Sequence, residues 1–348
     1  MSKKLVYELF PEDLALWMQE HGEPSFRVKQ VYEWIYKGVT SFDEMTNVGK
    51  GLREKLSEDF TFGGVQLVAN SGSKQDGSEK LLIALSDGNM VECVLMFHEY
   101  GISLCVSTQV GCKMHCAFCA TGMDGFVRNL TAGEIVAQVM QANALLRSRG
   151  LGTVQRLVYM GSGEPMDNYA NTIRSIRILH EPLGCNIGYR NFTISTSGLV
   201  EGIYSLIEEG LPLNLSISLH APNDKLRGEL LPIGKRFKIA ELIEAAMNYF
   251  DDSGRRVTIE YLIISGVNDT TEQAKELASL LKKYPFHVDL IPYNEVEGLE
   301  FKRPGMSRIG VFMDILRERG INATCRNSKG KDIDAACGQL RRRFADRQ

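Results

Sequence analysis

Three cysteines, Cys112, Cys116 and Cys119, stand close together in the run V-G-C-K-M-H-C-A-F-C, with the spacing C-x3-C-x2-C. Three thiolates on one short loop can bind three irons of a [4Fe–4S] cluster and leave the fourth iron without a protein ligand. An iron with an open coordination position can bind and activate a small molecule, as open metal sites do in other enzymes. The spacing therefore predicts a cluster that takes part in chemistry.

A zinc site is the alternative for the same cysteines. Zinc sites usually combine two C-x2-C pairs, or one such pair with histidines elsewhere in the chain. His115 lies inside the loop, where its position in sequence makes it a poor fourth ligand. The spacing favours the iron–sulfur cluster, and zinc or unliganded core cysteines stay the alternatives.

The composition is that of a globular protein with a substantial core, since 44% of the 348 residues are hydrophobic and 24% are charged. No run approaches the roughly 18–20 apolar residues of a membrane-spanning helix, and the first residues lack a signal-peptide core. We therefore expect a cytoplasmic protein, in which the eight cysteines favour metal binding or catalysis over structural disulfides. With a net charge of −3, a nucleic-acid enzyme must concentrate its positive charge locally.

Apolar periodicity divides the chain into three parts. Residues 5–60 show the 3.6-residue period of helices, and Pro11 suits the first turn of one of them. Between residues 62 and 97, turn signals such as Asp87-Gly88 separate short strand-like runs, which predict a β-hairpin connector. We expect an N-terminal helical accessory domain at 1–62, a β connector at 63–97 and a catalytic domain at 98–348.

Beyond the connector, apolar strands alternate with amphipathic helices. The capping box Thr131-Ala-Gly-Glu134 begins the clearest helix. Six βα units predict parallel strands, and six is two short of a closed eightfold barrel. The fold class is therefore α/β, an open, partial six-stranded (βα)6 barrel of the TIM type. The predicted strands are 102–107, 157–160, 192–195, 213–218, 257–264 and 287–291.

Polar motifs follow directly after these strands. The carboxyl ends of the strands in a βα barrel form one face, and that face carries the chemistry. We therefore expect the loops to meet at one active-site mouth. The motifs are Val110-Gly111-Cys112, Gly161-Ser162-Gly163-Glu164-Pro165, Ser195-Thr196-Ser197-Gly198, Ser218-Leu219-His220 and Pro292-Tyr293-Asn294.

Glu164 stands in a glycine-rich turn, where the backbone can approach a ligand closely. Its carboxylate could accept hydrogen bonds from an ammonium group, or it could be a surface glutamate on a tight strand-to-helix turn. Ser195, Ser218 and Asn294 are short polar residues of a kind that is common at strand ends, and His220 could be a buried histidine with satisfied hydrogen bonds. Together these side chains could bind a ribose and a carboxylate.

Several motifs together resemble the RlmN/Cfr family of radical S-adenosylmethionine (radical SAM) RNA methyltransferases. The resemblance covers essentially the whole chain. It implies a dual-specificity enzyme of the RlmN type that methylates C2 of an adenine in 23S ribosomal RNA and, in some bacteria, of an adenine in the tRNA anticodon loop. The motifs are the cysteine loop with Phe118, Cys105 seven residues before Cys112, Gly163-Glu164-Pro165, Ser218-Leu219-His220 and Asp332-Ile-Asp-Ala-Ala-Cys337-Gly-Gln-Leu340.

The resemblance also assigns roles to the matching positions. The three cysteines of the loop match the ligands of one [4Fe–4S] cluster that is exchangeable with SAM. Cys337 matches a cysteine that is itself methylated, Cys105 matches its resolving partner, and Glu92 matches a proton acceptor. The positions that match SAM contacts are Gly163, Glu164, Ser195, Ser218, Leu219, His220 and Asn294.

The implied reaction consumes two molecules of SAM. The first methylates the thiolate of Cys337 by displacement. The second is cleaved by an electron from the cluster to a 5′-deoxyadenosyl radical, which takes a hydrogen from the S-methyl group so that the carbon radical adds to C2. Glu92 removes the C2 proton, and the Cys105 thiolate attacks Cys337, which frees the methylated base and leaves a transient disulfide.

The residues alone leave simpler interpretations open. Cys105 could be a buried strand cysteine, Cys337 could pack a helix, and Glu92 could lie on a solvated strand face. The Cfr type shares the cysteines but methylates adenine C8 and confers antibiotic resistance, whereas Pro165 and the arginine-rich tail look more like RlmN. A methylthiotransferase would need a second cysteine array, and a zinc-containing RNA-binding module would have no use for Cys337.

RNA binding should involve cations that are grouped locally. Arg27, Lys29 and Lys37 in the N-terminal helices are the expected grip, and the basic segment 326–331 and the C-terminal arginines could add phosphate contacts. A flipped adenine would then enter the mouth at the carboxyl ends of the strands. We expect 23S rRNA and tRNA as partners, a flavodoxin as electron donor, a monomer and no membrane association.

Overall fold

The computed structural model describes residues 3–123, 125–326 and 329–333. A ten-stranded sheet runs through the protein and carries most of the site residues. In the order in which they neighbour one another, the strands are β14 (Asn322–Cys325), β13 (His287–Pro292), β12 (Thr258–Ile263), β11 (Asn214–Ser218), β10 (Phe192–Thr196), β9 (Arg156–Tyr159), β6 (Gly101–Cys105), β5 (Met90–His98), β4 (Glu79–Leu85) and β3 (Val65–Gly72).

The sheet has a parallel part and an antiparallel part. From β6 to β14 every neighbouring pair is parallel, whereas β3, β4, β5 and β6 are antiparallel to one another. All six predicted strands are present in the parallel part, and β14 adds a seventh that the sequence did not indicate. The predicted hairpin connector differs from the structure, because its residues form three strands that extend the same sheet.

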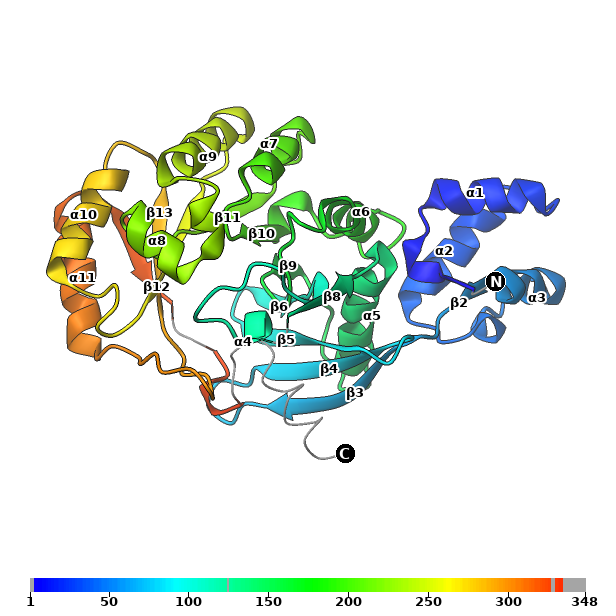
Figure 1. Ribbon diagram of the computed structural model, residues 1–348. Coiled ribbons are helices and arrows are strands. Elements are labelled where there is room, and N and C mark those ends of the chain that lie inside the picture. Colours follow the sequence, from blue (N-terminus) through cyan, green and yellow to red (C-terminus); the bar gives the residue numbers. More distant parts are fainter. Residues whose placement is uncertain (1–2, 124, 327–328, 334–348) are drawn as a thin grey trace.

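Helices follow the parallel strands and cover the outer face of the sheet (Figure 1). Alternation along each strand explains this layering: in β12, Ile259, Tyr261 and Ile263 belong to the main apolar core, while Glu260 and Leu262 face a cavity on the inner side. The helices are α5 (Ala132–Ser148), α6 (Tyr169–His180), α7 (Val200–Glu208), α8 (Asp224–Leu230), α9 (Ile239–Ser253), α10 (Thr271–Leu281) and α11 (Met306–Glu318).

Three further helices, α1 (Pro11–Glu20), α2 (Arg27–Lys37) and α3 (Lys50–Asp59), form the N-terminal end of the molecule, opposite α10 and α11 (Figure 1). Arg147 of α5 donates from Nη1 to the carbonyl of Lys37 at 2.8 Å and from Nη2 to that of Tyr36 at 3.0 Å. Apolar residues of these helices belong to the same core cluster as α5 and the sheet. The N-terminal helices are therefore packed onto the barrel rather than tethered to it.

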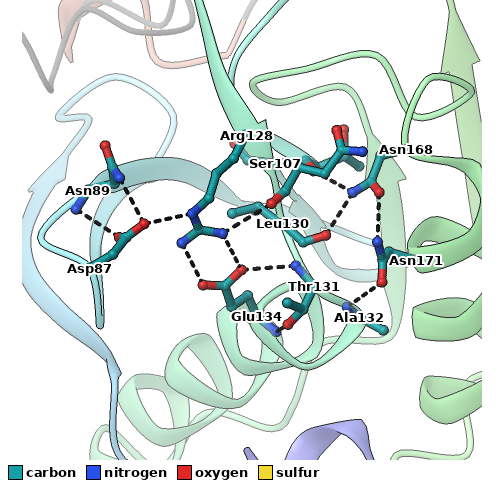
Figure 2. A network of polar contacts seen from close by, with 12 residues as sticks. Asp87, Asn89, Ser107, Arg128, Leu130, Thr131, Ala132, Glu134, Asn168 and Asn171 are labelled. Atoms are coloured by element: carbon teal, nitrogen blue, oxygen red, sulfur yellow. Dashed lines mark hydrogen bonds and ion pairs between the residues drawn. The ribbon is translucent and has the colours of Figure 1, made fainter. Parts of the chain in front are cut away.

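Arg128, on the short strand β8 (Phe126–Asn129), connects the antiparallel strands to the first βα unit (Figure 2). Its Nη1 and Nη2 donate to the carboxylate of Glu134 at 2.8 Å each, and its Nε donates to Asp87 at 2.6 Å. Thr131 caps α5 by accepting from the N–H of Glu134 at 3.2 Å, as the capping box predicts. Because Asp87 lies in the turn between β4 and β5, these contacts fix that turn against β8, which pairs with β7 (Gln109–Gly111).

Among the helices in the described part of the chain, none is both long enough and apolar enough to cross a bilayer.

Candidate active site

A cavity of about 950 Å³ lies against the inner face of the sheet. Its walls come from loops and strands that are far apart in sequence, as the expected convergence of the strand ends requires. Ten of the residues selected from the sequence line it: Cys105, Cys112, Cys116, Cys119, Gly163, Glu164, Ser195, Ser218, His220 and Asn294.

Two of the selected residues that the structure describes do not line this cavity. Leu219 is fully buried, and its backbone N–H donates to the carbonyl of Glu260 at 3.0 Å. Glu92 is buried on β5 and shares the strand face of Val94, which does line the cavity. Cys337 lies outside the described residues.

The cysteine loop leaves β7 (Gln109–Gly111) and ends at α4 (Ala120–Met123). Gly111 begins it in the left-handed region, at φ 74°, where a Cβ would lie 1.9 Å from the carbonyl oxygen of Gly125. Only glycine therefore allows the chain to turn here. The backbone N–H of Met114 points at Cys112 Sγ, 3.5 Å away, as a donor to a thiolate would.

The loop offers ligands that fit an iron–sulfur cluster. Its three thiols are free and line one cavity, and three thiolates on one short loop can bind three irons of a four-iron cube. Burial raises the pKa of Cys112 to about 12 and that of Cys116 well above its usual value, so both thiolates need metal cations to persist.

Glu164 is held in the cavity wall by backbone donors. Its Oε2 accepts from the N–H of Ser197 at 2.7 Å and its Oε1 from the N–H of Met166 at 3.1 Å. Burial raises the pKa of Glu164, and these hydrogen bonds oppose the rise. Gly163 has φ 104°, and a Cβ there would meet Gln109 Cβ at 2.6 Å. The turn therefore presents a fixed carboxylate that an ammonium group could bind.

Ser195 and Ser218 both hydrogen-bond to Glu260, a residue that no sequence motif indicated. Glu260 Oε2 accepts from Ser195 Oγ at 2.9 Å and from Ser218 Oγ at 3.4 Å. Glu260 Oε1 accepts from Arg326 Nη2 at 2.9 Å, and Arg326 Nε donates to Asp289 Oδ2 at 2.7 Å. Both serine hydroxyls thus donate their hydrogen atoms to Glu260, and their oxygen lone pairs stay available to accept hydrogen bonds from a ligand in the cavity.

Glu260, Asp289 and Arg326 are the site residues that sequence reasoning missed. Each of the two acids interrupts an otherwise apolar strand, and a buried charge needs a partner, so that interruption was the available signal. Arg326 belongs to the basic segment 326–331, which was expected to bind phosphate. In the structure it binds two carboxylates instead.

His220 is buried, and its backbone has φ 58°. Its Nδ1 accepts from the N–H of Leu262 at 3.0 Å, and its ring meets the edge of Phe118 in the cysteine loop, with centroids 5.0 Å apart. Burial, helped by the charge of Arg227, lowers the pKa of His220 to about 3. The imidazole is therefore neutral at physiological pH and acts as an acceptor.

Cys105 lies on β6 opposite Val94 of β5 and lines the cavity. Burial raises its pKa to about 12, although the charges of Arg326 and Lys80 act in the opposite direction. Glu92 lies on the same face of β5, two residues before Val94. The cysteine and the carboxyl residue therefore share one side of the sheet.

Two protein-family models match the chain. Residues 6–61 match the ribosomal RNA large subunit methyltransferase N-terminal domain, and residues 106–281 match the radical SAM superfamily. The two matches fall on the N-terminal helices and on the parallel part of the sheet.

Named relatives match nearly the whole chain. A probable dual-specificity RNA methyltransferase RlmN from Clostridium perfringens is 46% identical over 342 residues, covering 98% of this chain and 97% of the relative. One of the same name from Carboxydothermus hydrogenoformans is 46% identical over 338 residues, covering 97% and 98%. The crystal structure of a radical SAM methyltransferase from Sphaerobacter thermophilus superposes with a TM-score of 0.93 at 45% identity, covering 97% of this chain and 98% of that one.

Proposed function

The chain belongs to the RlmN family of dual-specificity RNA methyltransferases, and from that membership we propose that it methylates C2 of an adenine in 23S ribosomal RNA and of an adenine in tRNA. The family places it among the radical SAM enzymes, which use a [4Fe–4S] cluster and SAM. The observation that carries the proposal is one cavity whose wall holds the cysteine loop, the Gly163-Glu164 turn and Cys105 together.

Cys112, Cys116 and Cys119 would hold the cluster. When bound there, the [4Fe–4S] group supplies the electron that cleaves SAM to a 5′-deoxyadenosyl radical. The backbone N–H groups that fix the carboxylate of Glu164 prepare it for the ammonium group of SAM. The other residues proposed to contact SAM are Gly163, Ser195, Ser218, Leu219, His220 and Asn294.

The serines suit the ribose of SAM. Ser195 and Ser218 donate to Glu260, so their lone pairs can accept from the ribose hydroxyls. Leu219 would contribute through its backbone, since its side chain is buried. The neutral, buried ring of His220 adds an uncharged wall beside Phe118.

Cys105, Glu92 and Cys337 would carry the methyl transfer to carbon. The Cys337 thiolate takes a methyl group from SAM, and after hydrogen removal the carbon bound to its sulfur joins C2. Glu92 takes the proton that C2 loses, and the unpaired electron left on the base would return to the [4Fe–4S] group. The Cys105 thiolate then attacks the sulfur of Cys337 and forms a disulfide. The electron pair of the broken sulfur–carbon bond stays on the carbon, which takes up a proton to become the methyl group of the released base.

Anaerobic turnover tests the proposal. Reconstituted enzyme, SAM and reductant are incubated with unmodified ribosomal RNA or tRNA, and the digested nucleosides are identified by mass spectrometry. We expect 2-methyladenosine. If 8-methyladenosine appears instead, the chain acts as the Cfr type. If 5′-deoxyadenosine forms and neither RNA is methylated, the RNA assignment is wrong.

Cys105→Ala sharpens the test, with Cys93→Ala as the matched control on the opposite face of the neighbouring strand β5. Without the Cys105 thiolate nothing frees the base from Cys337, so we expect RNA covalently bound to the protein and no released product. The Cys93→Ala enzyme should turn over repeatedly. Repeated turnover by Cys105→Ala would remove Cys105 from the mechanism.

We also propose a flavodoxin as electron donor, a cytoplasmic location and a monomeric enzyme. Each turnover leaves a disulfide between Cys105 and Cys337 that a reductant must reopen, which a reducing compartment supports.

A further inference from the structure

The cavity reaches both ends of the parallel strands, and the two ends differ. At the carboxyl ends, the N–H of Ala117 in the cysteine loop donates to the carbonyl of Leu230 at 2.9 Å. A second apolar cluster joins this loop to the segments that follow β11 and β13. Its buried members are Ala120, Leu230, Leu231, Ile264, Tyr293 and Val296. These contacts pack the loops together over the carboxyl ends of the strands.

At the amino ends, exposed arginines line the cavity. Arg156 is the first residue of β9, Arg190 lies in the single turn η3 (Tyr189–Asn191) before β10, and Arg256 stands shortly before β12. We name these three residues the arginine edge. Within the described ranges none of them has a carboxylate within 4.0 Å. The arginine edge is thus a local positive potential in a chain of net charge −3.

Flat side chains stand beside the arginine edge. Tyr100, in the turn between β5 and β6, is 61% exposed. The ring of His98 stacks on it with centroids 4.7 Å apart and planes 7° apart, and the Arg156 guanidinium lies 4.5 Å from the Tyr100 centroid. His98 and Tyr100 also line the cavity. A nucleobase can extend a stack of this kind, since bases pile onto both aromatic rings and guanidinium planes.

We propose that the arginine edge and the stack of His98 and Tyr100 form the docking surface for a single-stranded RNA loop. The phosphates contact the three arginines, and unpaired bases extend the stack. The target base then reaches the cavity from the amino ends of the strands, past Cys105 on β6. This inference rests on the proposed function, because it identifies the surface that holds that RNA substrate.

Two features favour a single-stranded loop over a duplex. Chemistry on a base edge requires the base to leave its stack, which costs least where the base is already unpaired. The bases of a duplex are already stacked on one another, so they are not free to stack on His98 and Tyr100. The unpaired bases of a single strand can stack on these rings whatever their sequence.

Two of the cations that the sequence predicts to bind RNA, Arg27 and Lys29, have partners within the N-terminal helices. Lys29 lies 3.9 Å from the carboxylate of Glu33, and Arg27 donates to Gln30 Oε1 at 2.8 Å. Both lie on α2, outside the lining of the cavity. The carboxyl-end mouth expected from the sequence is likewise the end at which the loops pack together.

RNA affinity measured against salt tests the proposal. The reconstituted full-length enzyme is titrated anaerobically into a fluorescein-labelled RNA stem–loop whose loop carries the target adenine. For Arg156→Gln, Arg190→Gln and Arg256→Gln we expect binding weakened about 3- to 10-fold each, with the slope of log K against log salt reduced by about 0.7–1 each. The triple variant should lose about 100-fold or more.

Lys225→Gln is the matched control, because Lys225 is exposed near the start of α8, after the carboxyl end of β11. It removes one charge at the opposite end and should leave affinity unchanged. Tyr100→Ala should weaken binding about tenfold with the salt slope intact, and Tyr100→Phe should bind like the wild type. Iron content and melting temperature identify any variant that has lost its fold, and the single substitutions at exposed side chains preserve it.

The outcomes separate this inference from the proposed function. Wild-type affinity in the arginine variants, or weaker binding by Lys225→Gln, would place the docking surface elsewhere. Equal affinity for a fully paired duplex of the same length would overturn the single-stranded loop. If the arginine variants lose affinity while the wild type binds RNA and methylates none, the docking surface stands and the proposed reaction fails.

Discussion

Glu260 is the residue on which the polar wall of the cavity depends. It accepts from Ser195 and Ser218 and pairs with Arg326. A hydrogen bond to a charged group contributes about 1.5–3 kcal/mol. Losing that charge should therefore disturb ligand binding more than folding, since Arg326 keeps its contact with Asp289.

We expect Glu260→Gln to weaken SAM binding about tenfold, because the amide cannot orient both serine hydroxyls as the carboxylate does. Equilibrium dialysis of SAM against the reconstituted enzyme measures the loss. Glu244→Gln, at an exposed position on α9, is the matched control. Equal SAM affinity in all three proteins would mean that Glu260 has no part in holding SAM.

His220 links the site to pH. Its pKa is lowered by burial to about 3 in the fold, against about 6.5 in the unfolded chain. Below pH 6.5 the unfolded chain therefore binds a proton that the folded protein does not. The contribution of neutral His220 to the free energy of unfolding is fully present above pH 6.5. It is lost as the pH falls toward 3, by about 1.4 kcal/mol per pH unit.

His220→Asn should remove this loss. Asparagine tolerates the left-handed backbone at φ 58° and can accept from the N–H of Leu262. Between about pH 7 and pH 5, the wild type should lose about 2 kcal/mol more of its unfolding free energy than the variant. Urea unfolding at the two pH values measures the difference. Parallel losses in the two proteins would show that His220 is not the titrating group.

At the residue scale, the sequence predicted those site residues that lie close together in the chain, because their spacing indicates a shared site. The cysteine loop and the Gly163-Glu164 turn are local, and the structure brings both to one cavity. Glu260 and Arg326 were missed because their meaning comes from a pairing across 66 positions of sequence. A single acidic residue in a buried strand indicates that a cationic or hydrogen-bonding partner exists, but the sequence does not identify that partner.

At the scale of elements, the turn between β3 and β4 holds the segment that precedes Cys337. Ser73 Oγ donates to Asp332 Oδ1 at 2.6 Å, and the N–H of Lys74 donates to Oδ2 at 2.8 Å. The N–H of Gly330 donates to Asp76 Oδ2 at 2.7 Å. This turn therefore fixes the point from which the chain continues toward Cys337.

Ser73→Ala should slow methylation of Cys337 about 5- to 10-fold, since a hydrogen bond to a carboxylate is lost. Mass spectrometry of the Cys337 peptide after timed incubation with SAM measures it, and iron content should not change. Ser73→Thr should restore the rate because it keeps the hydroxyl, and Ser71→Ala is the matched control in β3. Wild-type rates for Ser73→Ala would limit the turn to a structural role.

Whether a strand could be predicted from the sequence depended on how clear its pattern of apolar residues is. All six βα strands carry apolar residues in alternating or continuous patterns, and they were predicted from the sequence. β14 was not, because Asn322–Cys325 is short and its exposed Asn322 and Thr324 interrupt any apolar pattern. Local turn signals predict a hairpin for the connector because they mark where strands end. The sheet that its strands join depends on partners distant in sequence.

For the whole molecule, the sequence boundary at residue 62 does not divide the core. Val6, Tyr7 and Tyr36 are buried in the same cluster as Ile135 of α5. Burying one large apolar side chain contributes about 1.5–3 kcal/mol, and a typical domain is stable by only about 5–15 kcal/mol. The N-terminal helices are thus part of the fold that supports the site.

A chain that starts at residue 63 should therefore fail to fold cooperatively, as well as fail to methylate RNA. Circular dichroism melting and size-exclusion chromatography measure this directly, with the full-length chain as the reference. A cooperative transition within a few degrees of the full-length protein would establish residues 63–348 as an independent folding unit.

The cavity is closed by the second apolar cluster at the carboxyl ends of the strands and is open at the arginine edge. This asymmetry should set the order in which the two substrates bind. Along β9 the register runs from Arg156 to Val158 opposite Cys105, and Glu164 follows the strand. With SAM bound at Glu164 as proposed, an RNA docked at the arginine edge would block both the arrival of SAM and the departure of its fragments. Steady-state kinetics should then be compulsory-ordered, with SAM first. An RNA analogue that cannot react should inhibit uncompetitively with respect to SAM, and a random mechanism would require a second passage to the cluster.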